Sequence, residues 1–386
     1  MNILKVLIQI QILIFKMNFF IKLIYINWPL QILILVTALF GFLMLYSVSG
    51  GSWDPWTRPQ LNRFFVSFFL IFVMSAISIS FWQKTSPYIY ILGLALLTAV
   101  YFFGETGMGA KRWLDLRVIK LQPSEAFKIS IVMALAYYYH KLPVNKVSHP
   151  FYVLIPLLLI LIPAFIVFRQ PDLGTALVIT MIGIFIMFIA GVHFGYFLFG
   201  GISFFTLLFV LFQSRGTEWQ LLKDYHFRRI DTFLDPSADP LGSGYHITQS
   251  KIALGSGGLF GKGYMQGSQS QLNFLPEKHT DFIFTTLAEE FGFFGTIGLL
   301  IIYSLIVLLC IFSALATTDK YSRLLITGLC MTFFTYFSIN IAMVMGLLPV
   351  VGIPLPLVSY GGSSMIVIML SFGLIQSAHV HKNNRF

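Results

Sequence analysis

Ten long apolar runs limit how this chain can fold more than any other feature of its sequence. Each run is close to the about 20 residues that an α-helix needs to cross the hydrocarbon core of a bilayer. The pattern predicts an all-α integral membrane protein with about ten transmembrane helices. The runs lie near residues 29–48, 64–81, 87–103, 122–140, 150–168, 173–191, 194–212, 283–315, 321–346 and 358–381.

The composition supports lipid as the solvent of this chain. Hydrophobic residues make up 57% of it and charged residues only 10%, whereas soluble domains carry about 25% charged residues. Cys310 and Cys330 lie inside apolar runs, which is typical of small core residues and provides no disulfide framework. The net charge of +10 comes from short loops between the runs, so we expect anionic membrane lipids rather than nucleic acid as partners.

The chain divides into an N-terminal extension, residues 1–28, and a single transmembrane domain, residues 29–386. The extension is apolar but interrupted by lysines. Two interpretations stay open: a helix lying in the membrane interface, or a start of translation at Met17. One large polar loop, at about 213–282, interrupts the domain and is long enough to expect a function of its own.

The distribution of Lys and Arg predicts the orientation in the membrane. If the N-terminus is cytoplasmic, the inner segments hold ten of these residues and the short outer loops hold seven. Because positive charge favours the cytoplasmic side, we expect both termini in the cytoplasm and the large loop outside.

Two polar clusters stand at the edges of central apolar runs. Lys111 and Arg112 belong to a basic loop, and Glu125 and Lys128 follow at i, i+3 spacing on one helix face. Ionisable groups within a membrane span are costly and usually functional, although a helix cap with a snorkelling lysine would give the same pattern. Asp172 stands at a helix start, where the helix dipole stabilises a carboxylate; capping alone would explain it.

Two further clusters lie in the C-terminal third. Glu277, His279 and Asp281 directly precede an apolar run. A carboxylate at the membrane edge can have a raised pKa and act as a base. The spacing fits no dedicated zinc signature. The stretch 347–364 is broken by prolines and glycines, which is tolerated at membrane depth only against protein or a water-filled cavity; a plain turn between helices is the alternative.

Under the expected topology all four clusters lie on the outer side of the membrane. Ser359 and Ser363, in the broken stretch, join them as candidates for substrate binding or support. Convergence of separate helices at one face is what a membrane-embedded site requires.

At these residues the sequence resembles the SEDS family (shape, elongation, division and sporulation proteins), and its elongation branch more than its division branch. The family usually has Gly near Asp115 and Arg or Gln in place of Lys278. The matching stretches, in family order, are GAKRWL (109–114), QPSEAFK (122–128), RQPDLGTAL (169–177), QSKIALGSGGLFGKG (249–263), FLPEKHTDFIF (274–284), LAEEFG (287–292) and GLLPVVGIPLPLVSYGGSS (346–364).

The resemblance implies a peptidoglycan glycosyltransferase in the bacterial cytoplasmic (inner) membrane, active during cell elongation. Such proteins polymerise lipid II, a disaccharide-pentapeptide carried on undecaprenyl pyrophosphate, and release the lipid pyrophosphate. It also implies a class B penicillin-binding protein as transpeptidase partner and a divalent cation, Mg²⁺ or Mn²⁺, with no organic cofactor.

The resemblance also assigns roles. Asp281 stands at the family's HTD position and is expected to be the general base. Glu125 is expected to pair with Lys128, and Asp172 to shape the cavity; Asp172 or Asp281 could hold the metal. His279 and Glu277 are supporting candidates. The groups expected to stabilise the leaving pyrophosphate are Lys111, Arg112, Lys128 and the cation.

Two other functions stay open at this point. Intramembrane charges and broken helices also suit a flippase that moves lipid II across the bilayer. Against it, the sequence shows no internal repeat, and its charged clusters favour one face over the midplane. A non-catalytic scaffold that recruits cell-wall enzymes is the second alternative, and it would not require Asp281.

Overall fold

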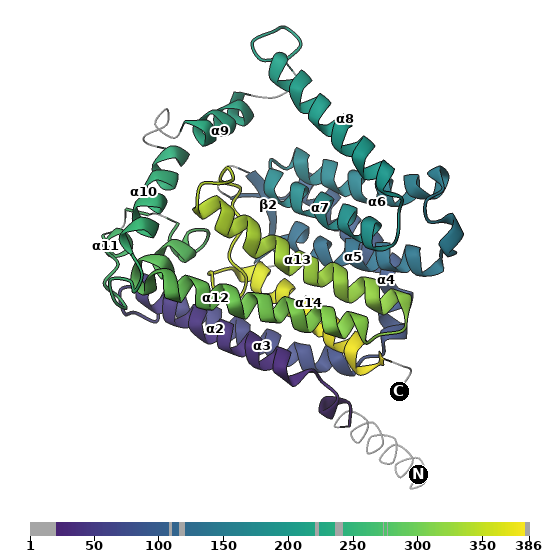
Figure 1. Ribbon diagram of the computed structural model, residues 1–386, viewed down its shortest axis with the longest axis horizontal. Coiled ribbons are helices and arrows are strands. Elements are labelled where there is room, and N and C mark those ends of the chain that lie inside the picture. Colours follow the sequence, from purple (N-terminus) through teal and green to yellow (C-terminus); the bar gives the residue numbers. More distant parts are fainter. Residues whose placement is uncertain are drawn as a thin grey trace.

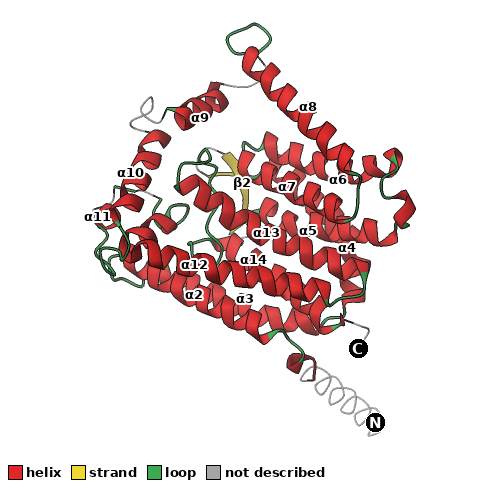
Figure 2. Cartoon of the chain, viewed as in Figure 1, coloured by secondary structure: helices red, strands yellow, loops and turns green. Residues whose placement is uncertain are grey.

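The protein is a bundle of helices with a three-stranded sheet at one end (Figures 1 and 2). The computed structural model describes residues 21–107, 110–115, 120–220, 224–235, 242–272, 274–275 and 277–382. The long helices are α2 (Trp28–Val48), α3 (Thr57–Ala76), α4 (Ile79–Phe103), α5 (Pro123–Lys141), α6 (Pro150–Arg169), α7 (Leu173–Ile189), α8 (Phe194–Gln213), α12 (Ile283–Leu315), α13 (Lys320–Val344) and α14 (Gly362–Val380).

These ten helices correspond to the ten apolar runs, so the predicted fold class is confirmed. In the described part of the chain, eight helices are long and apolar enough to cross a membrane. The other two lie beside them: α7 is apolar but has 17 residues, and α5 carries Glu125 and Lys128. The chain is therefore a multi-pass membrane protein. The interfacial helix expected for the N-terminal extension falls largely on residues 1–20, outside the described residues.

Helices α13 and α14 form the centre of the bundle. The most apolar windows of α13 and α14 are 78% and 83% buried, whereas the corresponding window of α8 is 0% buried. Helix α14 packs on α3, and α13 packs on α5, α7, α12 and α14. Figure 1 shows α8 at the edge of the molecule. The central helix α13 thus contacts the three helices, α5, α7 and α12, at whose starts polar clusters lie.

The predicted large loop contains short helices. They are α9 (Asp224–Leu234), α10 (Ser243–Ser256) and α11 (Ser268–Gln271). Helix α10 packs on α12 and α13, and α11 packs on α12. The loop is therefore partly anchored to the bundle.

The basic segment predicted as a loop forms the sheet instead. Strands β1 (Glu105–Gly107), β2 (Ala110–Asp115) and β3 (Lys120–Leu121) pair antiparallel in the order β1-β2-β3. Pairing satisfies backbone groups that a loop near the membrane would otherwise leave to water. The sequence signal for these strands is weak because they are short.

Helix α12 is interrupted at Gly292, where φ is 64° and ψ is −158°. The glycine-rich loop before α11 lies against the interruption. Its Lys262 N–H donates to Glu289 O (3.0 Å), and Phe293 N–H donates to Gly258 O (2.9 Å). The loop thus supplies partners for backbone groups that the interrupted helix leaves free.

Gly292→Ala is expected to destabilise the protein markedly. The backbone conformation is one that only glycine adopts readily, at a cost of about 1–3 kcal/mol for other residues. A Cβ there would also lie 2.3 Å from Gly261 N. Thermal unfolding in detergent should show a clearly lower melting temperature. Gly298→Ala is the matched control, since nothing lies within 4 Å of a Cβ at that position of the same helix; equal melting temperatures for the two variants would contradict the prediction.

Candidate functional site

The loop 277–282, which leads into α12, is held by hydrogen bonds to three consecutive backbone carbonyls. The donors come from α13 and from the broken segment 345–361 between α13 and α14. Because each carbonyl has its own donor, the loop has a defined path against the bundle. The bonds are Tyr360 N–H to His279 O (2.8 Å), Ser359 Oγ to Thr280 O (2.6 Å) and Asn340 Nδ2 to Asp281 O (2.8 Å).

The Asp281 side chain is placed where its charged form is disfavoured. Burial, with a smaller contribution from the charge of Glu277, raises the pKa of Asp281 from 3.8 to about 6. Its Oδ2 lies 3.5 Å from where a Cβ on Gly352 would stand. Within the described part of the chain, nothing donates a hydrogen bond to this carboxylate. A carboxylate without such donors is a stronger base.

An aromatic wall stands beside this loop. Trp56, just before α3, stacks on the ring of His279 with a centroid distance of 3.8 Å and an interplanar angle of 15°. Tyr360 meets Trp56 edge-on, and the guanidinium of Arg63 lies 5.0 Å from the Tyr360 ring centroid. Burial lowers the pKa of His279, which favours its neutral form at neutral pH. The start of α3 thus forms one side of the site.

Glu125, Lys128 and Tyr336 form a buried triad. Lys128 Nζ lies 2.6 Å from Glu125 Oε1, and Tyr336 OH donates to Glu125 Oε2 over 2.6 Å. Lys128 also contacts the Tyr336 hydroxyl, and each of the three side chains is almost inaccessible to solvent. The expected Glu125–Lys128 pair is therefore present, with a tyrosine from α13 that the sequence did not indicate.

Asp172 caps α7 and is surrounded by donors. Its carboxylate accepts from Thr175 N–H (3.2 Å) and Gln122 Nε2 (3.3 Å), and Arg112 Nε lies 3.9 Å away. Arg112 also donates to Pro171 O. The charge of Asp172 is thus largely compensated, and Arg112 links β2 to the start of α7.

Helix α13 and the broken segment bring these groups together. Tyr336 and Asn340 are one turn apart on α13, about 6 Å along its axis; the first contacts the triad and the second contacts the Asp281 loop. A Cβ on Gly174, near the start of α7, would lie 2.6 Å from Val351 O. Val351 is next to Gly352, which faces Asp281. All four sequence clusters therefore meet at one end of the bundle.

The remaining candidates, Ser359, Glu277 and Ser363, differ in what they contact. Ser359 Oγ donates to Thr280 O and accepts from Leu355 N–H (2.8 Å), so it braces the loop. Glu277 Oε2 accepts from Thr280 Oγ1 (2.9 Å). Ser363 is buried at the start of α14.

Two parts of the expected site remain: the Lys111 side chain and a metal ion. The backbone of Lys111 lies in β2, but its side chain lies outside the described residues. Among the residues that the structure describes, no group of three or more His, Cys, Asp or Glu side chains could hold a metal ion by itself.

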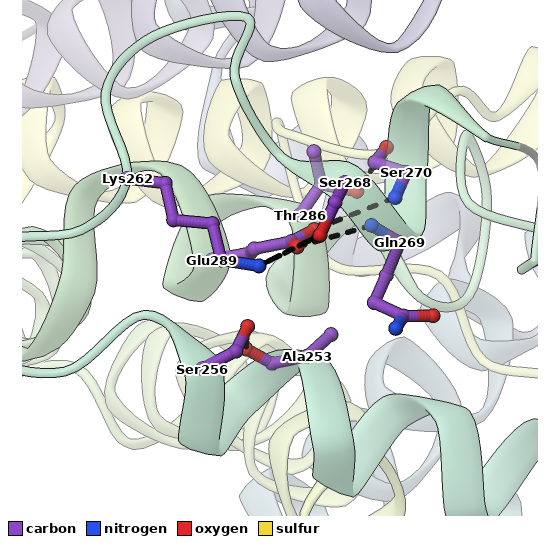
Figure 3. A network of polar contacts seen from close by, with 8 residues as sticks. All are labelled: Ala253, Ser256, Lys262, Ser268, Gln269, Ser270, Thr286 and Glu289. Atoms are coloured by element: carbon purple, nitrogen blue, oxygen red, sulfur yellow. Dashed lines mark hydrogen bonds and ion pairs between the residues drawn. The ribbon is translucent and has the colours of Figure 1, made fainter.

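A separate buried network lies around Glu289 on α12 (Figure 3). Glu289 Oε1 lies 2.7 Å from Lys262 Nζ and accepts from Ser268 Oγ (3.1 Å) and Gln269 N–H (3.0 Å). Glu289 lies in the stretch LAEEFG (287–292), one of those that carry the family resemblance. The network ties the glycine-rich loop and α11 to α12, just after the Asp281 loop.

Sequence reasoning missed Tyr336, Asn340 and Arg63. The sequence contained a signal for two of them. Tyr336 and Asn340 have polar groups and stand four residues apart in a largely apolar run, a spacing that puts both on one helix face. Arg63 lies just before the start of a predicted run. Without knowing which helices pack together, neither pattern could be linked to the Asp281 loop.

These features define a multi-pass helical membrane protein with a buried carboxylate site at one end of its bundle. Comparison with known families identifies which one: the chain belongs to the cell cycle protein family of FtsW, RodA and SpoVE, whose pattern it matches over residues 27–384. The resemblance found in the sequence is thereby confirmed.

Curated relatives match over most of their length. The peptidoglycan glycosyltransferase MrdB of Escherichia coli K12 is 40% identical over 358 residues, covering 92% of this chain and 94% of that protein. The Helicobacter pylori protein of the same name is 36% identical over 340 residues, covering 81% and 86%. A probable peptidoglycan glycosyltransferase FtsW of Buchnera aphidicola is 35% identical over 328 residues, covering 83% and 90%.

Solved structures share the fold. A chain of a peptidoglycan synthase complex that coordinates polymerisation and crosslinking superposes with a TM-score of 0.78 at 28% identity, covering 92% of this chain and 97% of that one. The rod shape-determining protein RodA of Thermus thermophilus superposes with a TM-score of 0.69 at 26% identity, covering 93% and 98%.

Proposed function

We propose that this protein is a peptidoglycan glycosyltransferase that polymerises lipid II into glycan strands, with Asp281 as general base. The observation that carries the role of Asp281 is a carboxylate with raised pKa on a loop held at three consecutive carbonyls. Relatives named as peptidoglycan glycosyltransferases support the reaction class.

The reaction transfers a glycan from a lipid pyrophosphate to a sugar hydroxyl. Asp281 takes the proton of the acceptor hydroxyl as its oxygen attacks the anomeric carbon of the donor. The bond from that carbon to the pyrophosphate oxygen breaks, and its electron pair leaves with undecaprenyl pyrophosphate. A base with a pKa of about 6 is roughly nine-tenths ionised at pH 7 and is still basic enough to assist.

The charge of the leaving pyrophosphate requires compensation. Lys111, Arg112 and Lys128 are the proposed cationic residues, with Glu125 and Tyr336 orienting Lys128. Lys128 is buried in its triad, so it contributes a fixed positive charge.

A divalent cation, Mg²⁺ or Mn²⁺, fits the donor set if the substrate supplies most of its ligands. Mg²⁺ is commonly bound by one or two carboxylates together with substrate phosphates, so a cluster of three protein ligands is not needed. Asp172 or Asp281 would be the protein ligand, and the cation would neutralise charge on the pyrophosphate. Asp172 already has Arg112 beside it, which makes Asp281 the less compensated of the two.

The proposed location is the bacterial cytoplasmic (inner) membrane, with both termini in the cytoplasm and the site at the outer face. The count of Lys and Arg in the short loops supports this orientation. A class B penicillin-binding protein is the proposed partner during cell elongation, since the structural neighbour comes from a complex that couples polymerisation to crosslinking.

Reconstitution tests the activity directly. The purified protein, with its cognate class B penicillin-binding protein, is incubated with fluorescent lipid II and Mg²⁺ in the presence of moenomycin, which silences contaminating polymerases of the other type. A ladder of glycan strands on a gel is the expected result, and excess chelator is expected to remove it until Mg²⁺ or Mn²⁺ is returned.

Two other outcomes would change the proposed function. If the protein forms no ladders in a preparation where the Escherichia coli relative forms them, the proposal of a polymerase fails. Movement of labelled lipid II across the membrane of proteoliposomes would then support a flippase. Ladders that persist in excess chelator would exclude the cation from the proposal.

A further inference from the structure

We propose that Asn340 is a positioning residue for Asp281, resting on the proposed role of Asp281 as general base. Asn340 lies in the last two turns of α13 and is 0% exposed. Its amide nitrogen donates to Asp281 O over 2.8 Å and to Ile353 O over 2.7 Å. A single side chain thus joins a regular helix, the Asp281 loop and the broken segment.

The two hydrogen bonds use both protons of the Asn340 amide. The amide oxygen, Oδ1, is buried without a hydrogen-bond partner among the residues that the structure describes. Leaving a buried acceptor unpaired is unfavourable, so the amide is not placed by its oxygen. It is placed by the two carbonyls, which lie on segments far apart in the chain.

Asn340 differs from the other two donors to the loop. Of the three bonds to the carbonyls of residues 279–281, those from Ser359 and Tyr360 come from the broken segment, which is itself irregular. The bond from Asn340 comes from a helix packed on α5, α7, α12 and α14. Asn340 therefore relates the Asp281 loop to the fixed part of the bundle.

The same contact sets the environment of the carboxylate. With its carbonyl held by Asn340, Asp281 presents Oδ2 toward Gly352, one residue before Ile353, the second carbonyl that Asn340 holds. Without the amide, two buried carbonyls lose their donor, and the loop gains freedom to move toward water. The Asp281 carboxylate is then no longer held at one position relative to α13 and the broken segment.

The effect on the reaction rate distinguishes a positioning role of Asn340 from a role in packing alone. A variant that only loses folded protein has a lower rate per total protein but the wild-type rate per folded monomer. A variant that displaces Asp281 has a lower kcat per folded monomer, while KM changes little because lipid II still binds.

The experiment compares Asn340→Leu, which is near in size and lacks both donors, with wild type in the reconstituted polymerisation. Initial rates are measured at saturating and limiting lipid II, per amount of folded monomer. We expect kcat to fall roughly 10- to 100-fold and KM to change little. Thr332→Val is the matched control; among the residues that the structure describes, its buried hydroxyl bonds only within α13, to Gly328 O (2.9 Å).

The outcomes are distinguishable. A kcat per folded monomer equal to that of wild type would show that Asn340 only packs, and would overturn the inference. If Asp281→Asn itself keeps the wild-type rate, the general-base proposal fails instead. Should Asn340→Leu not fold, Asn340→Ser, which keeps one donor in a smaller side chain, is measured in the same way and is expected to lower kcat per folded monomer with little change in KM.

Discussion

Asp281→Asn is expected to abolish glycan polymerisation at every pH at which wild type is active. The amide has nearly the same shape but cannot accept the hydroxyl proton, and loss of a general base typically costs 10²- to 10⁴-fold in rate. The measurement is ladder formation from fluorescent lipid II with the partner present. A variant as active as wild type would show that Asp281 is not the base and would favour a scaffold.

The pH dependence of wild type provides a second readout of the same residue. Because a general base works only when deprotonated, and the pKa of Asp281 is raised to about 6, the rate should fall as the pH drops through about 6. Glu277→Gln removes the nearby negative charge that contributes to this shift. Its acidic limb should therefore lie at lower pH than that of wild type, and a limb at higher pH would contradict the assignment.

Lys128→Met is expected to destabilise the protein by about 3–5 kcal/mol, the range found when one partner of a buried ion pair is removed. Glu125 would keep the hydrogen bond from Tyr336 but lose its counter-charge in a site that is almost fully buried. The double variant Glu125→Gln/Lys128→Met removes both charges, so most of the stability should return. Polymerisation should be lost in the single variant and in the double variant, because both lack the positive charge proposed to stabilise the pyrophosphate.

Thermal unfolding of the purified variants in detergent measures the first part, and the ladder assay measures the second. Lys141→Met is the matched control, since Lys141 lies at the exposed end of the same helix, where its ammonium stands over the Tyr137 ring. Equal melting temperatures for wild type and Lys128→Met would contradict the expectation. A double variant with wild-type polymerisation would show that the triad has only a structural role.

The sequence by itself determined the fold class and the parts of the site. Membrane helices are specified by local composition and length, so all ten long helices were predicted within a few residues at most ends, apart from the earlier starts of α3 and α4. Helix α4, for example, begins at Ile79. The sequence predicted a start near Pro87 because Gln83 and Lys84 interrupt the apolar run. The four polar clusters were visible because ionisable residues and broken backbone are unusual at membrane depth.

Only the tertiary structure decided how these parts act together. Asn340 bonds to a carbonyl 59 residues away, and Tyr336 to a carboxylate 211 residues away; no local pattern encodes such pairs. The raised pKa of Asp281 likewise depends on burial, which arises when the loop, α13 and the broken segment pack together. Composition and period act along the chain, whereas desolvation and hydrogen-bond partners depend on which surfaces meet in space.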